Sequence, residues 1–132
     1  ESKFTMNNKK IITKNAPLPI GPYTQATEAN GFLFLSGQIA LNPQNGELVN
    51  TNIVEETHQV MQNIRGVLNA AELDFNHIVK SSIFLKNLDD FQAVNTEYAK
   101  YFEAGEAPAR ECVEVSRLPK DVNIEISVIA AK

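Results

Sequence analysis

The chain has 132 residues, of which 43% are hydrophobic, and carries a formal net charge of −4. This size and composition fit one globular domain with a modest core. The acidic balance provides no basic patch for nucleic acid, and no apolar run approaches the roughly 20 residues of a membrane-spanning helix. Because Cys112 is the only cysteine, no intrachain disulfide can form, and we expect a reducing, cytoplasmic setting. A cleaved signal peptide would leave no trace in this chain.

The N-terminal segment, residues 1–8, is interpreted as an extension or remnant, with Met6 as a candidate native start. We expect residues 9–132 to form the single domain. His58, His77 and Cys112 do not have the spacing of a zinc site, so no metal is expected.

The first expected strand, residues 9–13, leads into a segment in which three prolines forbid a helix and favour a stiff loop. Tyr23 ends this loop directly after Gly21-Pro22. The tyrosine either caps an edge of the core or is aimed at a binding pocket.

A second strand is expected over residues 32–40, after Asn30-Gly31, which is a strong hairpin turn signal. It contains Ser36 and Gly37. A glycine within a strand marks either a packing bulge or a close approach of the backbone to another group. A brief return strand is expected over residues 47–49.

Two amphipathic helices are predicted. The first begins at Asn52, which has Glu55 three residues later, and runs to about Ala71 with apolar residues at helical spacing. A strand over residues 77–86 follows. The second helix runs from Asp89 to about Ala104, and its apolar stripe includes Asn95. This amide either satisfies a nearby backbone group or holds a loop at a site.

The last two expected strands carry the candidate active site. Residues 110–115 and 122–128 alternate polar and apolar side chains on either side of a turn at Pro119. If the two runs pair as a hairpin, Arg110, Cys112 and Glu114 share a face with Asn123, Glu125 and Ser127. The simplest alternative is that this face is the solvated side of an antiparallel sheet.

The expected order is therefore β-β-β-α-β-α-β-β, and its two helices can cover only one face of the sheet. Several motifs of the chain (NAPLPIGPY, SGQI, PAREC, RLPKD and IEI) resemble the reactive intermediate deaminase family, also called Rid or YjgF-like. This resemblance spans nearly all of residues 9–131. It implies a chorismate-mutase-like α+β fold, a mixed sheet and a homotrimer with clefts between its subunits.

By this resemblance, Arg110 anchors a substrate carboxylate and Glu125 positions a water molecule. The pocket-lining positions that it implies are Tyr23, Ser36, Gly37, Asn95 and Cys112, the last through its backbone. The implied reaction is the hydrolysis of 2-iminobutanoate or 2-iminopropanoate to a 2-oxo acid and ammonia, without a cofactor. An arginine fork suits a planar carboxylate, and a carboxylate can activate water for attack on a C=N bond.

Glu111 departs from the family pattern, which has a small residue at this position. By the alternation it points toward the apolar face, so it lies either at a frayed strand start or against a cation such as Arg65. Alternative functions are small-carboxylate binding without catalysis, a regulatory or holdase trimer, and chorismate-mutase-like chemistry. RNA binding is disfavoured by the acidic charge, and fold alone is weak evidence for function.

Overall fold

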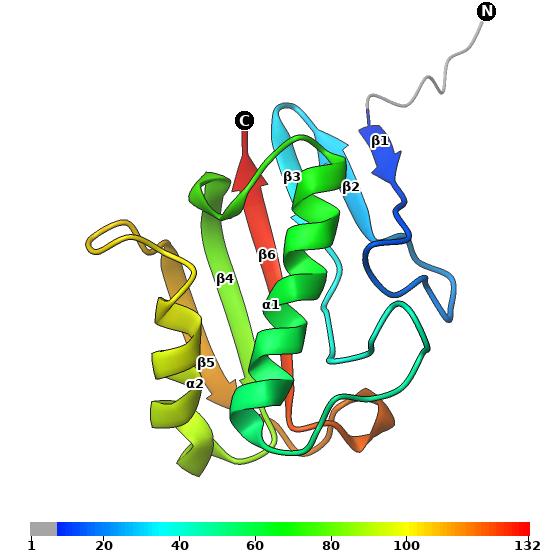
Figure 1. The fold of residues 1–132 in the computed structure, drawn as a ribbon. Coiled ribbons are helices and arrows are strands. Elements are labelled where there is room, and N and C mark those ends of the chain that lie inside the picture. Colours follow the sequence, from blue (N-terminus) through cyan, green and yellow to red (C-terminus); the bar gives the residue numbers. More distant parts are fainter. Residues whose placement is uncertain (1–7) are drawn as a thin grey trace, which may run out of the picture.

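The computed structural model describes residues 8–132. A six-stranded mixed sheet has the order β1-β2-β3-β6-β4-β5, and two α-helices lie on one of its faces (Figure 1). The strands are Asn8–Ile11 (β1), Ala26–Ala29 (β2), Phe32–Leu35 (β3), Ile78–Leu85 (β4), Ala109–Glu114 (β5) and Ile124–Ala131 (β6); the helices are Ile53–Ala70 (α1) and Phe91–Ala99 (α2). Neither helix has the length and apolar character required to cross a lipid bilayer.

The order from the first helix onward is confirmed. Before that helix the number of strands agrees only because an unpredicted strand, β2, takes the place of one that was predicted, and the predicted strand over residues 32–40 ends at Leu35. The turn signal at Asn30-Gly31 joins β2 and β3, and both turn residues have positive φ, 53° and 83°, as a tight hairpin requires. β2 was not predicted. The predicted strand over residues 47–49 is reduced to one bridge between Leu41 and Leu48. Of the predicted extension over residues 1–8, only Asn8 is described, and it belongs to β1.

The first predicted helix is confirmed. Asn52 is the N-cap of α1, and its side chain accepts a hydrogen bond from the Glu55 backbone N–H at 2.8 Å. The helix ends at Ala70. The second helix is shorter than predicted: α2 begins at Phe91 after a 3-10 turn and ends at Ala99.

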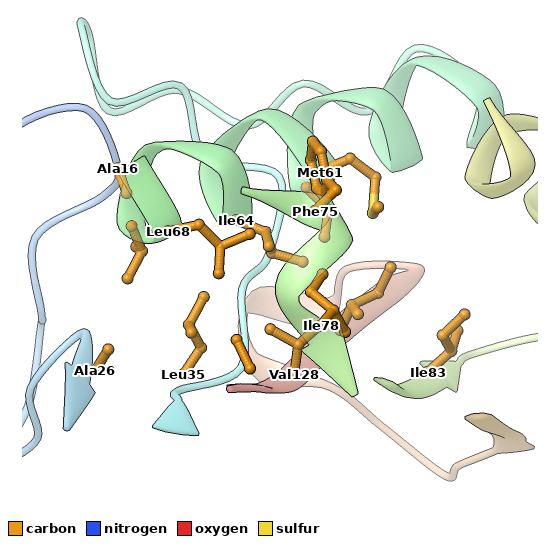
Figure 2. Packing of buried hydrophobic residues seen from close by; sticks show 14 of the residues in the cluster. Ala16, Ala26, Leu35, Met61, Ile64, Leu68, Phe75, Ile78, Ile83 and Val128 are labelled. Carbon is orange, nitrogen blue, oxygen red and sulfur yellow. The ribbon is translucent and has the colours of Figure 1, made fainter. Parts of the chain in front are cut away.

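The core lies between the helices and the sheet. Figure 2 shows Ile64 and Leu68 of α1 above Leu35 and Val128 of the sheet. All four are buried, and burial of such side chains is the main force that holds a helix against a sheet. The opposite face of the sheet has no helix in the described part of the chain. We call it the open face.

The predicted hairpin between the last two strands is wrong. β5 pairs with β4 in parallel, and β6 lies between β3 and β4 in antiparallel pairing. Period-2 alternation identifies each strand but does not identify its partner. The 3-10 turn at Pro119–Asp121 therefore belongs to a crossover from the edge of the sheet to its centre.

Candidate functional site

Arg110 lies on the helix-covered face of β5. Its strand neighbour in the parallel register is Ser81, which is buried beneath α2. The guanidinium Nη1 donates a hydrogen bond to Asn95 Oδ1 at 2.7 Å. The guanidinium carbon also lies 5.6 Å from the ring centre of Phe91 and 5.3 Å from that of Tyr98, within the range of cation–π attraction. We call these five residues the Arg110 cluster.

The Arg110 cluster holds a cation that is not neutralised by a carboxylate. No salt bridge to Arg110 occurs in residues 8–132. Tyr98 donates its hydroxyl to Ser81 Oγ at 2.8 Å, and burial raises the pKa of Tyr98, so its ring is a neutral support. The amide of Asn95 orients the guanidinium without cancelling its charge, which leaves the rest of the fork available to an anion.

Cys112 lies on the same face of β5 as Arg110 and packs against the core. Burial raises the pKa of the Cys112 thiol, and the Arg110 charge opposes this shift more weakly. The thiol is therefore protonated near neutral pH, which is unsuited to a nucleophile.

A separate hollow of about 370 Å³ contains Glu125. We call it the Glu125 pocket. Its walls are mostly apolar and come from the proline-rich loop, the segment after β3 and the crossover to β6: Pro17, Leu18, Ile20, Tyr23, Ser36, Gly37, Gln38, Ile39, Leu41, Pro119 and Glu125. Three of the predicted pocket residues, Tyr23, Ser36 and Gly37, are thus brought together around Glu125.

Glu125 is the carboxyl group among the residues that line this pocket. Burial raises the pKa of its carboxyl, and no hydrogen bond or cation in the described part of the chain counteracts that shift. A carboxylate with a raised pKa in an apolar hollow is suited to accept a proton from water and return it.

Gly37 packs directly against this carboxylate. A Cβ at position 37 would overlap the Glu125 side chain, so the backbone at Gly37 does approach another group closely, and that group is Glu125. Gly37 lies two residues beyond the end of β3 and not within a strand as predicted. Ser36 donates its hydroxyl to the Thr24 backbone oxygen at 2.6 Å. This bond ties the floor of the pocket to the end of the proline-rich loop.

The structure does not bring Arg110 and Glu125 together within one chain, and the predicted shared face is wrong. Ile124 and Ile126 are buried on the helix side of β6, so the alternation places Glu125 on the open face, whereas Arg110 lies beneath α2. β4 also separates their strands, which puts them about 10 Å apart along the sheet in addition to its thickness. The two clusters of one chain therefore cannot contact the same small molecule.

Another hollow, of about 450 Å³, lies between α1 and the segment that follows α2. It is lined by Arg65 and Phe75 together with several acidic residues, and it contains none of the predicted site residues. Despite its larger volume, its polar walls are less suited to an organic substrate than the apolar Glu125 pocket.

Three buried polar residues near the Glu125 pocket were not predicted: Gln25, Glu56 and Asn63. Glu56 accepts hydrogen bonds from the backbone N–H and the side chain of Asn123, at 2.8 and 2.7 Å, and so anchors the chain two residues before Glu125. The sequence did contain a signal for two of them. Glu56 and Asn63 fall between Ile53, Val60 and Val67 on the apolar stripe of α1.

Glu111 points to the open face, not toward the core. It forms an ion pair with Lys80 at 2.9 Å and accepts a hydrogen bond from Ser82. The expected contact with Arg65 is wrong, because Arg65 lies over the rings of Phe75 and Tyr101. Within residues 8–132, no three His, Cys, Asp or Glu side chains are grouped as a candidate metal site.

The fold is an α+β fold that holds a cation, Arg110, on the helix-covered face of the sheet and an isolated carboxylate, Glu125, on the open face. The chain belongs to the Rid/YjgF family: residues 13–132 match the family model described as Endoribonuclease L-PSP. It is 44% identical over 127 residues to the 2-iminobutanoate/2-iminopropanoate deaminase of Escherichia coli K12. The aligned residues cover 95% of this chain and 98% of the deaminase.

Solved structures agree with this membership. A conserved Rid family protein from Yersinia pestis is 48% identical, covers 95% of this chain and 99% of its own, and superposes with a TM-score of 0.92. The Escherichia coli protein TdcF with bound serine is 38% identical, covers 94% and 98%, and has a TM-score of 0.88. The description of the family and the name of the deaminase indicate different activities, so membership alone does not define the reaction.

Proposed function

We propose that the protein hydrolyses small 2-imino acids, such as 2-iminobutanoate and 2-iminopropanoate, to 2-oxo acids and ammonia. The observation that carries this proposal is the Glu125 carboxyl, whose pKa is raised by burial in an apolar pocket. The deaminase of Escherichia coli, 44% identical over 127 residues, supports the same reaction class.

The proposed reaction begins when the Arg110 fork binds the substrate carboxylate through two parallel hydrogen bonds. Glu125 takes a proton from a water molecule as the water oxygen bonds to the imine carbon. Glu125 then returns that proton to the nitrogen. The C–N bond breaks with its electron pair on the departing ammonia, and the hydroxyl proton passes through Glu125 to the same nitrogen as the carbonyl forms.

A complete site requires a second copy of the chain, because Arg110 and Glu125 lie on opposite faces of one sheet. We propose a homotrimer in which the Arg110 cluster of each copy faces the Glu125 pocket of a neighbour. The open face supports this arrangement, since Phe32, Phe34 and Val113 on it are 43%, 44% and 43% exposed. Apolar patches of this kind are typical of surfaces that associate.

Mixed trimers test the shared site. Arg110→Ala and Glu125→Gln should each be inactive alone. If they are unfolded, mixed in equal amounts and refolded together, every mixed ring has one intact Arg110–Glu125 pair. About three-quarters of random trimers are mixed, so about a quarter of the wild-type sites should return. A site within one chain would give no recovery at any mixing ratio, and light scattering on the same samples would identify the trimer.

The reaction itself is tested by generating 2-iminobutanoate with a threonine dehydratase and following the release of 2-oxobutanoate with and without the protein. Acceleration that depends on both Arg110 and Glu125 is the expected result. No acceleration by the wild-type trimer would contradict the proposed hydrolysis.

A second candidate function is small-acid binding without turnover, which TdcF with bound serine favours. In this case Arg110 would bind the carboxylate of an amino acid and Glu125 its ammonium group. Calorimetry would then detect serine binding by a protein that leaves the imine assay unchanged. The raised pKa of Glu125 disfavours this role, because a group that pairs with an ammonium functions best when ionised.

A further inference from the structure

Two buried side-chain amides hold the opposite walls of the Glu125 pocket. We infer that Gln25 and Asn63 are positioning residues that set the width of this pocket and thereby the length of the substrate side chain that it accepts. This inference rests on the proposed function, because it takes the substrate side chain to lie against the apolar walls.

Gln25 holds the wall formed by the proline-rich loop. Its side chain is 1% exposed. Its Oε1 accepts a hydrogen bond from the Thr13 N–H at 2.7 Å, and its Nε2 donates to the carbonyl oxygens of Thr13, Ala16 and Pro17 at 3.0, 3.2 and 2.8 Å. The loop contains no strand or helix between β1 and β2, so this amide replaces the backbone hydrogen bonds that regular structure would provide.

The same residue connects the loop to the floor of the pocket. The Gln25 backbone oxygen accepts a hydrogen bond from the Ser36 N–H at 2.9 Å. Leu18 and Ile20, which the loop presents at the pocket, are 55% and 70% exposed. Burial therefore does not fix their positions, and the loop that carries them depends on its polar anchors.

Asn63 holds the opposite wall. It is completely buried on α1, and its Nδ2 donates to the carbonyl oxygens of Ile39 and Leu41 at 3.0 and 2.8 Å. Both of these residues line the pocket. Its Oδ1 accepts from Gln59 at 2.9 Å, so the amide itself is fixed. The Ile39 oxygen also accepts a hydrogen bond from the Leu41 N–H, so removing the amide would weaken the hold on Ile39 and deprive the Leu41 oxygen of the Asn63 donor.

Helix α1 also contacts the proline-rich loop from the outside. A Cβ at Gly66 would overlap the Asn15 carbonyl oxygen. The loop rests on the helix at the one position where no side chain intervenes. Both walls of the pocket are thus in contact with α1, which is the more extensively buried of the two α-helices.

The principal test uses Gln25→Met, which keeps the length of the side chain and removes its hydrogen bonds. It is assayed with 2-iminopropanoate and with 2-imino-4-methylpentanoate. We expect kcat/KM to fall about tenfold more for the longer substrate, since each methylene in an apolar pocket is worth about tenfold or more. Asn63→Leu should show the same pattern. Ile78→Ala is the matched control, because this buried residue lies at the end of β4 remote from Glu125. It should lower the melting temperature without changing the ratio of the two rates.

Gly66→Ala provides an independent route if the amide variants fail to fold. Alanine favours the helix, and its methyl group displaces the loop at Asn15. The same loss of selectivity is expected. Equal losses for both substrates in every one of these variants that folds would overturn the inference.

Hydrogen exchange separates this inference from the proposed function, since it needs no activity. The Thr13 N–H should be protected in the wild-type protein and exchange at least tenfold faster in Gln25→Met. Protection unchanged in the variant would overturn the positioning role even if deamination is confirmed. Faster exchange in a protein without imine hydrolysis would preserve the loop anchor and refute only the reaction.

Discussion

Gly37 and Glu125 touch across neighbouring segments of the sheet, and a single methyl group at position 37 would displace the carboxylate. The glycine is required for space, not for backbone freedom, because its φ is not positive. A residue that contributes no functional group thereby determines where the proposed general base lies.

Gly37→Ala should therefore reduce imine hydrolysis about a hundredfold while the protein folds and assembles normally, since removing a positioned general base costs about 10²–10⁴ in rate. Gly21→Ala is the matched control within the same pocket region. A Cβ at Gly21 would meet only the Tyr23 ring, at an ordinary 3.7 Å. Full activity of Gly37→Ala would show that the position of Glu125 is unimportant.

Glu125→Gln should abolish most activity and raise the melting temperature at neutral pH. Burial raises the folded-state pKa of Glu125, so the folded protein holds this proton more tightly than the unfolded chain does. Stability is therefore lost as the pH rises from the unfolded to the folded pKa. The neutral amide avoids that loss. The melting temperatures of the wild-type protein and of Glu125→Gln, measured between pH 4 and 8, should converge at the acidic end. A melting temperature of the variant below that of the wild type at pH 7 would contradict the unpaired state of this carboxylate.

The rate should report the same ionisation. A general base works only when deprotonated, so kcat/KM should fall as the pH drops through the raised pKa of Glu125. The acid limb is expected above the ordinary glutamate value of about 4.3. Measuring kcat/KM as a function of pH, with a substrate generated enzymatically and at constant ionic strength, gives the pH at which the rate begins to fall. A rate that is independent of pH down to pH 4 would exclude Glu125 as the base.

Arg110→Ala and Arg110→Lys should both lose about a hundredfold in kcat/KM, because an ammonium keeps the charge but lacks the planar fork. The melting temperature should also fall slightly, since Arg110 bonds Asn95 and lies over two rings. Asn95→Ala is the comparison: it removes the orienting amide and leaves the cation in place, so a smaller loss is expected. Retention of activity by Arg110→Lys would contradict bidentate binding.

Cys112→Ser should keep most of the activity, because burial raises the pKa of the thiol and it is not ionised near neutral pH. Slow alkylation of the wild-type protein by iodoacetamide would confirm the protonated thiol. A folded, assembled serine variant without activity would assign the sulfur a chemical role.

The sequence predicted those features that depend on local patterns. Asn52 was recognised as the helix cap because capping involves residues three apart, and Asn30-Gly31 as a tight turn because both positions need positive φ. The partner of a strand depends on residues far away in the chain. The alternation of polar and apolar residues in β5 and β6 could not predict that β4 lies between these two strands. This arrangement separates Arg110 from Glu125.

The polar anchors were harder to recognise for another reason. Gln25 directly precedes β2 and has no periodic neighbours that mark it as buried. Its function depends on three carbonyl groups in an irregular loop, whose positions are set only by the fold. Asn95 was identified as unusual within an apolar stripe, but the sequence did not indicate a side chain as its partner. Its partner is the Arg110 side chain.

The placement of Arg110 and Glu125 on opposite faces of one sheet has a consequence for the amount of protein in a cell. Under the proposed arrangement a newly made chain is silent until it meets other copies, so the yield of working sites rises more steeply than the chain concentration. Halving the expression would remove more than half of the activity when the concentration is near that needed for assembly. A measured activity per chain that declines on dilution would reveal this threshold.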